Sequence, residues 1–207
     1  IPIARLVATR LTGMPMPLRL YYCENVYRVE HTMRGKPSEI YQAGVELIGS
    51  NSLRSDLEIV ELAASGLSDI NGESFRIELC HIGYFKALID SLDAGADTKE
   101  AIRQCIEQKN YPALSDLLAP FGDSRAAAAL GYLPRLFGGE EVFGKAYELF
   151  SENGALECLD YLHGLYEDLR QLGPGALVIE LEAHHGQQGV TVHGPPPDRG
   201  RVRVEAF

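Results

Sequence analysis

The chain has 207 residues, of which 45% are hydrophobic and 23% are charged, and its 19 basic and 29 acidic side chains give a formal net charge of −10. These proportions are typical of a folded globular protein rather than of a disordered chain. The acidic balance argues against a protein that holds nucleic acid on a broad basic surface. No apolar run reaches about 18 residues, so we expect no membrane-spanning helix.

The four cysteines, Cys23, Cys80, Cys105 and Cys158, are widely spaced and form no CxxC pair. We therefore expect neither a metal cluster nor a disulfide framework, and we expect Cys80, Cys105 and Cys158 to act as small core residues. The chain begins with Ile1 rather than Met, and its first residues do not have the charged-then-apolar pattern of a signal peptide. We expect a fragment or processed chain of a cytoplasmic protein.

The first part of the chain predicts one helix followed by strands. A helix over 4–11 ends at Gly13 and at the prolines that follow it. Aromatic and apolar runs predict strands over 18–22, 26–30 and 39–48, with a polar turn at 34–37 between the last two. Helical spacing then runs from Leu57 to Leu67, and clean alternation predicts a strand over 75–79.

The middle of the chain is helical, and its end returns to strands. Apolar residues recur at helical spacing from Phe85 to Leu172, and strands are predicted over 176–181, 190–192 and 201–204. We expect an α+β fold in which the last strands rejoin the first sheet. The predicted domains are a first sheet part over 1–82, a helical insertion over 83–173, and return strands with a divergent end over 174–207.

The hairpin carries the candidate site. Side chains two apart on a strand share a face, so Arg28 and Glu30 point one way, and Gln42, Gly44 and Glu46 do the same on the partner strand. The opposite face of that strand is apolar. The same pattern is typical of any half-solvated sheet, so the pattern alone leaves a purely structural interpretation open. That apolar face consists of Tyr41, Ala43, Val45 and Leu47.

The sequence of the hairpin closely resembles the second signature motif of class II aminoacyl-tRNA synthetases in its histidyl version. The resembling residues over 20–49 are LYY…VYRVE…YQAGVELIG. This resemblance implies an antiparallel class II sheet with a helical insertion. It also implies that Arg28 holds an α-phosphate, that Glu30 faces the adenine, and that Gln42 and Glu46 line a histidine pocket. A guanidinium suits phosphate, and a carboxylate with an amide can hold an ammonium group or an imidazole N–H.

Departures from the synthetase pattern argue against catalysis. Lys36 and Ser38 stand where arginines that grip the outer phosphates are expected. The segment 181–192 has neither the arginine nor the paired tyrosines of the later histidine signature, and the third class II motif is absent before Phe207. Without these cations the charge of adenylate formation is poorly stabilised. We therefore assign no catalytic residue, metal or cofactor.

The helical block resembles the regulatory subunits of the short-form ATP phosphoribosyltransferase, which are related to histidyl-tRNA synthetase. The resembling segments are 51–58, 78–88, 108–114 and 133–139. This resemblance implies a non-catalytic subunit of histidine biosynthesis that binds L-histidine as an effector, forms a homodimer within a hetero-oligomer, and activates a catalytic phosphoribosyltransferase chain. Two alternatives stay open: a fragment or divergent form of a true histidyl-tRNA synthetase, and a scaffold that no longer binds a ligand.

Other candidate groups favour structural roles. Glu180, Glu182, His184 and His185 have the chemistry of metal ligands, but adjacent histidines on a strand point to opposite faces, and we expect a solvated tail instead. His81 and His163 lie singly in apolar surroundings and are expected to be structural histidines with satisfied nitrogens. Gly138 and Gly139 are expected to form a turn.

Overall fold

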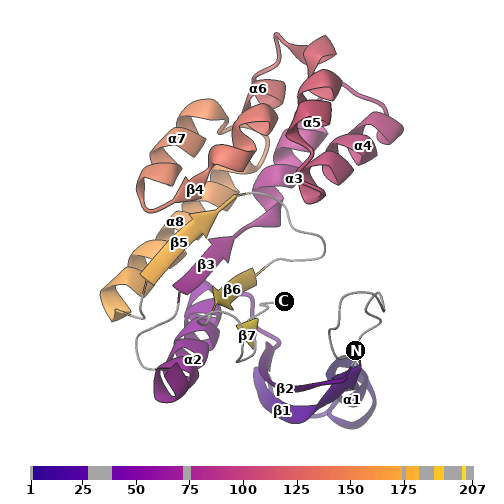
Figure 1. Cartoon of the computed structure of the whole chain (residues 1–207). Helices are drawn as coiled ribbons and strands as arrows, with labels where there is room; N and C mark the ends of the chain where they lie inside the picture. Colours follow the sequence, from indigo (N-terminus) through magenta and orange to yellow (C-terminus); the bar gives the residue numbers. More distant parts are fainter. Residues whose placement is uncertain are drawn as a thin grey trace. The chain divides into compact units, whose positions relative to one another are not determined.

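The computed structural model describes residues 2–27, 39–71, 76–173, 176–181, 189–193 and 202–203. The chain divides into two compact units, Ile1–Ser55 and Asp56–Phe207, and each is described by itself. The first unit contains α1 (Pro2–Arg10) and an antiparallel ribbon of β1 (Leu18–Tyr27) and β2 (Glu39–Ile48), drawn in indigo and violet in Figure 1. The strand predicted over 39–48 is confirmed. The interruption predicted after Tyr22 is absent, because Cys23, Glu24 and Asn25 all pair with β2.

The second unit is built around a five-stranded sheet with the order β4-β5-β3-β6-β7. Its central strand β3 (Arg76–Cys80) follows α2 (Leu53–Asn71), whose first residues belong to the first unit. Figure 1 shows β3 and β5 (Ala176–Glu180) side by side and pointing the same way, and their pairing is parallel. The other described strand pairs are antiparallel, and they include β6 (Gly189–His193) and β7 (Val202–Arg203).

The return strands therefore rejoin β3, as predicted, but they do not extend the β1–β2 ribbon, which stands as a sheet of its own among the described strands. The parallel β3–β5 pair explains the insertion. Parallel neighbours need a long crossover connection, and the whole helical block supplies it. The turn predicted at Gly138 is wrong: β4 (Phe137–Gly138) pairs with β5, with Gly138 opposite Ile179.

The helical block begins at α3 directly after β3 and ends at α8 just before β5. Side-chain caps begin two of these helices. Asn110 Oδ1 accepts the backbone N–H of Ala113 at the start of α5, and Ser124 Oγ accepts the backbone N–H of Ala127 at the start of α6. No described helix is long and apolar enough to cross a membrane. The helices are α3 (Ile82–Ser91), α4 (Ala96–Glu107), α5 (Tyr111–Leu118), α6 (Arg125–Tyr132), α7 (Glu141–Leu149) and α8 (Ala155–Leu172), with 3-10 turns at Ala119–Phe121 and Leu133–Arg135.

The core of the second unit joins the sheet to the first and last helices of the insertion. Leu88 of α3, Leu159 of α8, and Ile77 and Ile179 of the sheet are fully buried. Tyr84 lies among them, and its hydroxyl donates to the carbonyl oxygen of Ala146 at 3.2 Å. Burial of each such side chain is worth about 1.5–3 kcal/mol, so these contacts hold the crossover against the sheet.

Candidate functional site

The β1–β2 ribbon has two distinct faces, because residues directly opposite each other on paired strands point the same way. The register sets Tyr22 opposite Gly44 and Leu20 opposite Glu46. We call the face that contains these pairs the Glu46 face. The structure thus brings Gln42 and Glu46 together on one face, as predicted. The Glu46 face includes Leu18, Leu20, Tyr22, Glu24, Val26, Gln42, Gly44, Glu46 and Ile48.

The ring of Tyr22 lies directly over Gly44. A Cβ atom added to Gly44 would be 2.5 Å from Cζ and 2.6 Å from the hydroxyl oxygen of Tyr22, a distance at which real Cβ atoms are essentially never found. The phenol reaches past the glycine to Gln42, whose Nε2 donates a hydrogen bond to the Tyr22 hydroxyl. The sequence alone assigns no role to Tyr22. The signals that could have indicated one are its place in the LYY part of the hairpin motif and its spacing of two residues from Leu20.

Glu46 is half-buried and lies opposite the apolar Leu20. Within the described part of the chain its carboxylate makes no hydrogen bond or ion pair. The oxygens of a half-buried carboxylate can accept hydrogen bonds from a ligand that carries N–H groups, such as an ammonium group or an imidazole. The Glu46 face therefore offers an acid, an amide and an aromatic ring within one strand pair.

The other two predicted site residues, Arg28 and Glu30, lie outside the described residues, as does the segment 31–38 with Lys36 and Ser38. The last described residue of β1 is Tyr27. The assignment of Arg28 to a phosphate and of Glu30 to the adenine side therefore stays a prediction.

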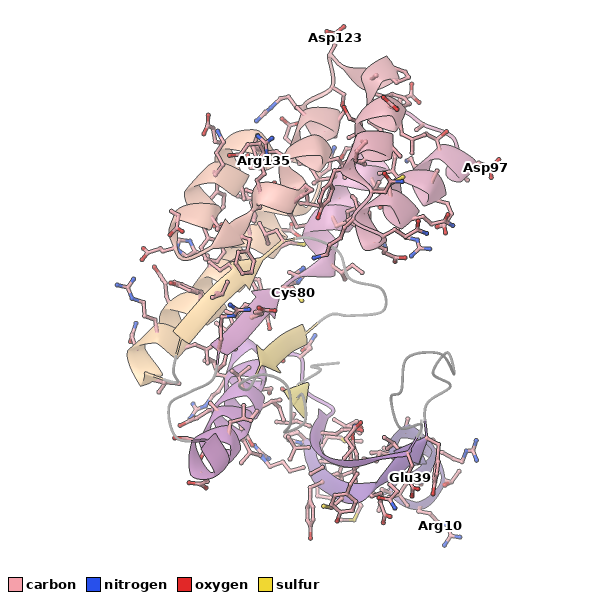
Figure 2. The ribbon with its side chains drawn as sticks, viewed as in Figure 1. Arg10, Glu39, Cys80, Asp97, Asp123 and Arg135 are labelled. Carbon is pink, nitrogen blue, oxygen red and sulfur yellow. The ribbon has the colours of Figure 1, made fainter. Side chains whose placement is uncertain are left out.

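The opposite face of the ribbon is exposed and aromatic. The exposed fractions of Tyr21, Tyr27 and Tyr41 are 83%, 74% and 70%. Cys23 donates to the Tyr41 hydroxyl at 3.0 Å, and this hydrogen bond raises the pKa of the Tyr41 phenol. At the start of β2, Glu39, labelled in Figure 2, accepts a hydrogen bond from Tyr27 at 3.0 Å. The sequence predicted the apolar character of this face, but the described residues leave it uncovered.

A second group of polar side chains gathers where β3 ends at Cys80, labelled in Figure 2, and α3 begins. His81 Nδ1 accepts the backbone N–H of Gly83 at 3.1 Å and caps α3. Its ring meets Tyr161 edge-on at 5.8 Å, and the Tyr161 hydroxyl donates to Asp56 Oδ2. Burial lowers the pKa of His81, and the nearby Asp56 opposes this shift.

This group accounts for His81 as a structural histidine, as predicted. Burial also raises the pKa of the Tyr161 phenol, with the Asp56 hydrogen bond as the second cause. The link between Asp56 and Tyr161 spans 105 positions of sequence, and sequence analysis missed it because no local pattern connects two residues so far apart.

Two other expectations about single residues need correction. His163 stacks on Phe143 with ring centres 4.3 Å apart, but its buried Nε2 makes no hydrogen bond to the described residues and lies 3.7 Å from Glu167 Oε1, so the expected satisfied nitrogen is not found there. Cys80, Cys105 and Cys158 are partly exposed rather than fully buried in the core. The described residues hold no group of three potential metal ligands. His184 and His185 lie outside them.

Comparison with known proteins decides the family. A family model described as histidyl-tRNA synthetase matches residues 1–191. The chain belongs to the histidyl-tRNA synthetase family. The predicted class of fold, a class II synthetase-like α+β arrangement with a helical insertion, is thereby confirmed.

Within this family the chain is similar to proteins named ATP phosphoribosyltransferase regulatory subunit. It is 37% identical over 177 residues to the protein of Clostridium kluyveri, a match that covers 84% of this chain and 45% of the relative. It is 41% identical over 169 residues to the protein of Caldanaerobacter subterraneus subsp. tengcongensis, a match that covers 80% of this chain and 44% of that relative. The chain thus spans about half the length of these curated relatives.

Solved structures agree with the family assignment. The crystal structure of an ATP phosphoribosyltransferase regulatory subunit/histidyl-tRNA synthetase from Bacillus halodurans matches with a TM-score of 0.81 at 30% identity, over 93% of this chain and 51% of that chain. A chain of the ATP phosphoribosyl transferase (HisG:HisZ) complex from Thermotoga maritima matches with a TM-score of 0.72 at 19% identity, over 94% and 70%. The second likeness is one of fold.

Proposed function

We propose that this chain is part of a regulatory subunit of ATP phosphoribosyltransferase, an enzyme of histidine biosynthesis, and that it has no aminoacylation activity of its own. The observation that carries this proposal is the 37–41% identity, over at least four-fifths of the chain, to relatives with that name. The loss of the expected arginines at Lys36 and Ser38 supports the non-catalytic part, because adenylate formation needs cations around its phosphates.

The effector in this proposal is L-histidine, bound on the Glu46 face. Glu46 supplies a half-buried carboxylate opposite Leu20, and Gln42 supplies an amide on the same face. Together these groups suit the ammonium group and the imidazole N–H of histidine. Arg28 and Glu30, which lie outside the described residues, belong to the proposed pocket because the hairpin motif resembles that of histidyl-tRNA synthetase. The pocket requires neither a metal nor a cofactor.

The proposed partner is the catalytic subunit of ATP phosphoribosyltransferase, joined by a homodimer of this subunit in a cytoplasmic hetero-oligomer without nucleic acid. Histidine bound to this subunit alters the partner only if the two states of the complex bind histidine with different affinity. Regulation is therefore a coupling between the Glu46 face and the subunit contact.

Isothermal titration of the chain with L-histidine tests the pocket. We expect binding by the unchanged chain and none by Glu46→Ala, since the substitution removes the carboxylate that receives the ligand's N–H groups. Glu39→Ala is the matched control: it removes a glutamate from the same strand but from the opposite face, and should bind as the unchanged chain does. Equal affinity in Glu46→Ala would refute the pocket.

A second function, histidine activation with ATP, is favoured by the family model itself, whose description is that of a synthetase. ATP–pyrophosphate exchange in the presence of histidine separates the two. We expect no exchange by this chain. Exchange that disappears in Arg28→Ala would make the synthetase the correct assignment.

A further inference from the structure

We propose that Tyr22 is a positioning residue of the histidine site: its phenol holds the amide of Gln42 in the orientation that meets the ligand, and Gly44 is required because it makes room for the ring. This inference rests on the proposed function, since it assigns the means by which that site is preorganised. It concerns three described residues on one face of one strand pair.

The first observation is the place of the ring. Tyr22 and Gly44 are direct partners in the ladder, and the Tyr22 ring atoms Cε1 and Cζ lie 2.5 Å from the point where a Gly44 Cβ would be. Any larger residue at position 44 must push the ring away from the sheet. Glycine inside a strand often marks a place where another group approaches the backbone closely, and here that group is the Tyr22 ring.

The second observation is the hydrogen bond at the end of the ring. Gln42 lies two residues from Gly44 on the same face, so a ring that crosses Gly44 brings its hydroxyl to the amide of Gln42, and Nε2 donates to it. A glutamine side chain with no fixed orientation loses rotamer entropy when a ligand orders it. The phenol supplies that order before the ligand arrives, which lowers the cost of binding.

The third observation is the relation to Glu46. Leu20 and Tyr22 are neighbours on the Glu46 face, and Leu20 is the ladder partner of Glu46. The Tyr22 ring therefore lies between the row that holds Gln42 and the row that holds Glu46. An amide has distinct donor and acceptor ends, so a hydrogen bond at one end also fixes the direction of the other.

A double-mutant cycle on histidine affinity tests this inference. Tyr22→Phe keeps the ring and removes only the hydroxyl, and we expect it to weaken histidine binding by about three- to tenfold, the effect of one hydrogen bond. In a chain that already carries Gln42→Ala, Tyr22→Phe should change the affinity by less than about twofold, because its effect passes through Gln42. Tyr21→Phe, on the opposite face and 83% exposed, is the matched control and should have no effect.

Gly44→Ala should weaken binding at least as much as Tyr22→Phe, because the new methyl group displaces the ring. Gly66→Ala, where a Cβ meets no atom within 4 Å, is its control and should bind normally. Thermal unfolding of each variant reports whether it folds, and Tyr22→Phe keeps the test decisive if Gly44→Ala does not.

The outcomes separate this inference from the proposed function. If the unchanged chain binds no histidine, both fail. If it binds histidine and Glu46→Ala does not, but Tyr22→Phe binds with unchanged affinity, the pocket stands and the positioning role is wrong. An equal loss from Tyr22→Phe with and without Gln42 would also overturn the positioning role, because the tyrosine would then act independently of the amide.

Discussion

His81 ends the connection from β3 and begins α3, and its neutral Nδ1 accepts the N–H of Gly83. Burial lowers its pKa below the ordinary 6.5, with Asp56 as a weaker opposing influence. The unfolded chain therefore binds a proton more readily than the folded chain. The stability that comes from neutral His81 is fully present above pH 6.5 and is lost as the pH falls through the lower pKa of the folded state.

The pH dependence of stability checks this role. We expect His81→Asn to keep the cap, because asparagine is a strong N-cap residue, and to lose less stability than the unchanged chain between about pH 7 and about pH 5. The measurement is the free energy of unfolding by denaturant at several pH values. If the two chains lose stability with the same slope, the His81 cap is not the acid-sensitive group.

The hydrogen bond from Tyr161 to Asp56 makes a stability prediction at the same scale. Tyr161→Phe should cost about 1.5–3 kcal/mol, because it leaves a partly buried carboxylate without a donor that joined α8 to α2. Tyr147→Phe is the matched control: it removes an exposed phenol–carboxylate bond to Asp160 of 2.8 Å and should cost less than about 1 kcal/mol. Equal costs in denaturant unfolding would contradict the structural weight given to Asp56.

At the scale of elements, the two-residue strand β4 joins the helical insertion directly to the sheet. Gly138 pairs with Ile179 of β5 and has a φ of +155°, and a Cβ at this position would lie 2.6 Å from Glu141 Oε1. The Glu141 carboxylate accepts the N–H of Gly139 at 2.9 Å, and this bond lowers the pKa of Glu141. The strand, the turn and the start of α7 thus form one connected arrangement.

Two glycine substitutions six residues apart test this arrangement. Gly138→Ala should lower the free energy of unfolding by more than about 1 kcal/mol, since alanine is strained at this backbone angle and its methyl group displaces the Glu141 carboxylate. Gly144→Ala should raise it by about 0.5–1 kcal/mol, because position 144 lies inside α7 with open space around its Cα. Denaturant unfolding measures both. A neutral Gly138→Ala would show that β4 does not constrain the insertion.

At the scale of the whole molecule, the proposed regulation requires reciprocity. If histidine on the Glu46 face lowers the activity of a catalytic chain by favouring one state of the complex, the catalytic chain must change the affinity for histidine by the same coupling. Typical couplings change the affinity by about 5- to 150-fold. Regulation should therefore change two separate quantities: the activity of the catalytic chain when histidine is added, and the affinity for histidine when the catalytic chain is added.

Mixing this chain with a catalytic ATP phosphoribosyltransferase chain tests the coupling. We expect faster phosphoribosyl transfer on mixing, a lower rate when histidine is added, and a histidine affinity that differs between the mixture and the chain alone. Glu46→Ala should keep the activation and lose the inhibition, whereas Glu39→Ala should behave as the unchanged chain. Separate elution of the two proteins with an unchanged transfer rate would contradict the regulatory assignment.

The candidate site illustrates how far sequence reasoning reached. Alternation along β2 predicted that Gln42, Gly44 and Glu46 share a face, and the ladder confirms it, because the side-chain period of a strand is fixed by its backbone. The role of Gly44 needed the structure. A glycine in a strand pattern does not reveal which ring lies over it, and Tyr22 is one of two adjacent tyrosines that the sequence alone does not distinguish.

The sequence by itself determined the elements whose residues lie close together along the chain: the strand over 39–48, the alternation of β3, the helices of the insertion, and the motif that resembles histidyl-tRNA synthetase. Beyond the hairpin of β1 and β2, the tertiary structure decided which strands are direct neighbours. The parallel pairing of β3 with β5, the two-residue strand β4 and the Tyr161–Asp56 bond all join distant segments. The physical reason is that periodicity records which side of an element is buried, whereas the choice of its partner depends on contacts between segments that share no local pattern.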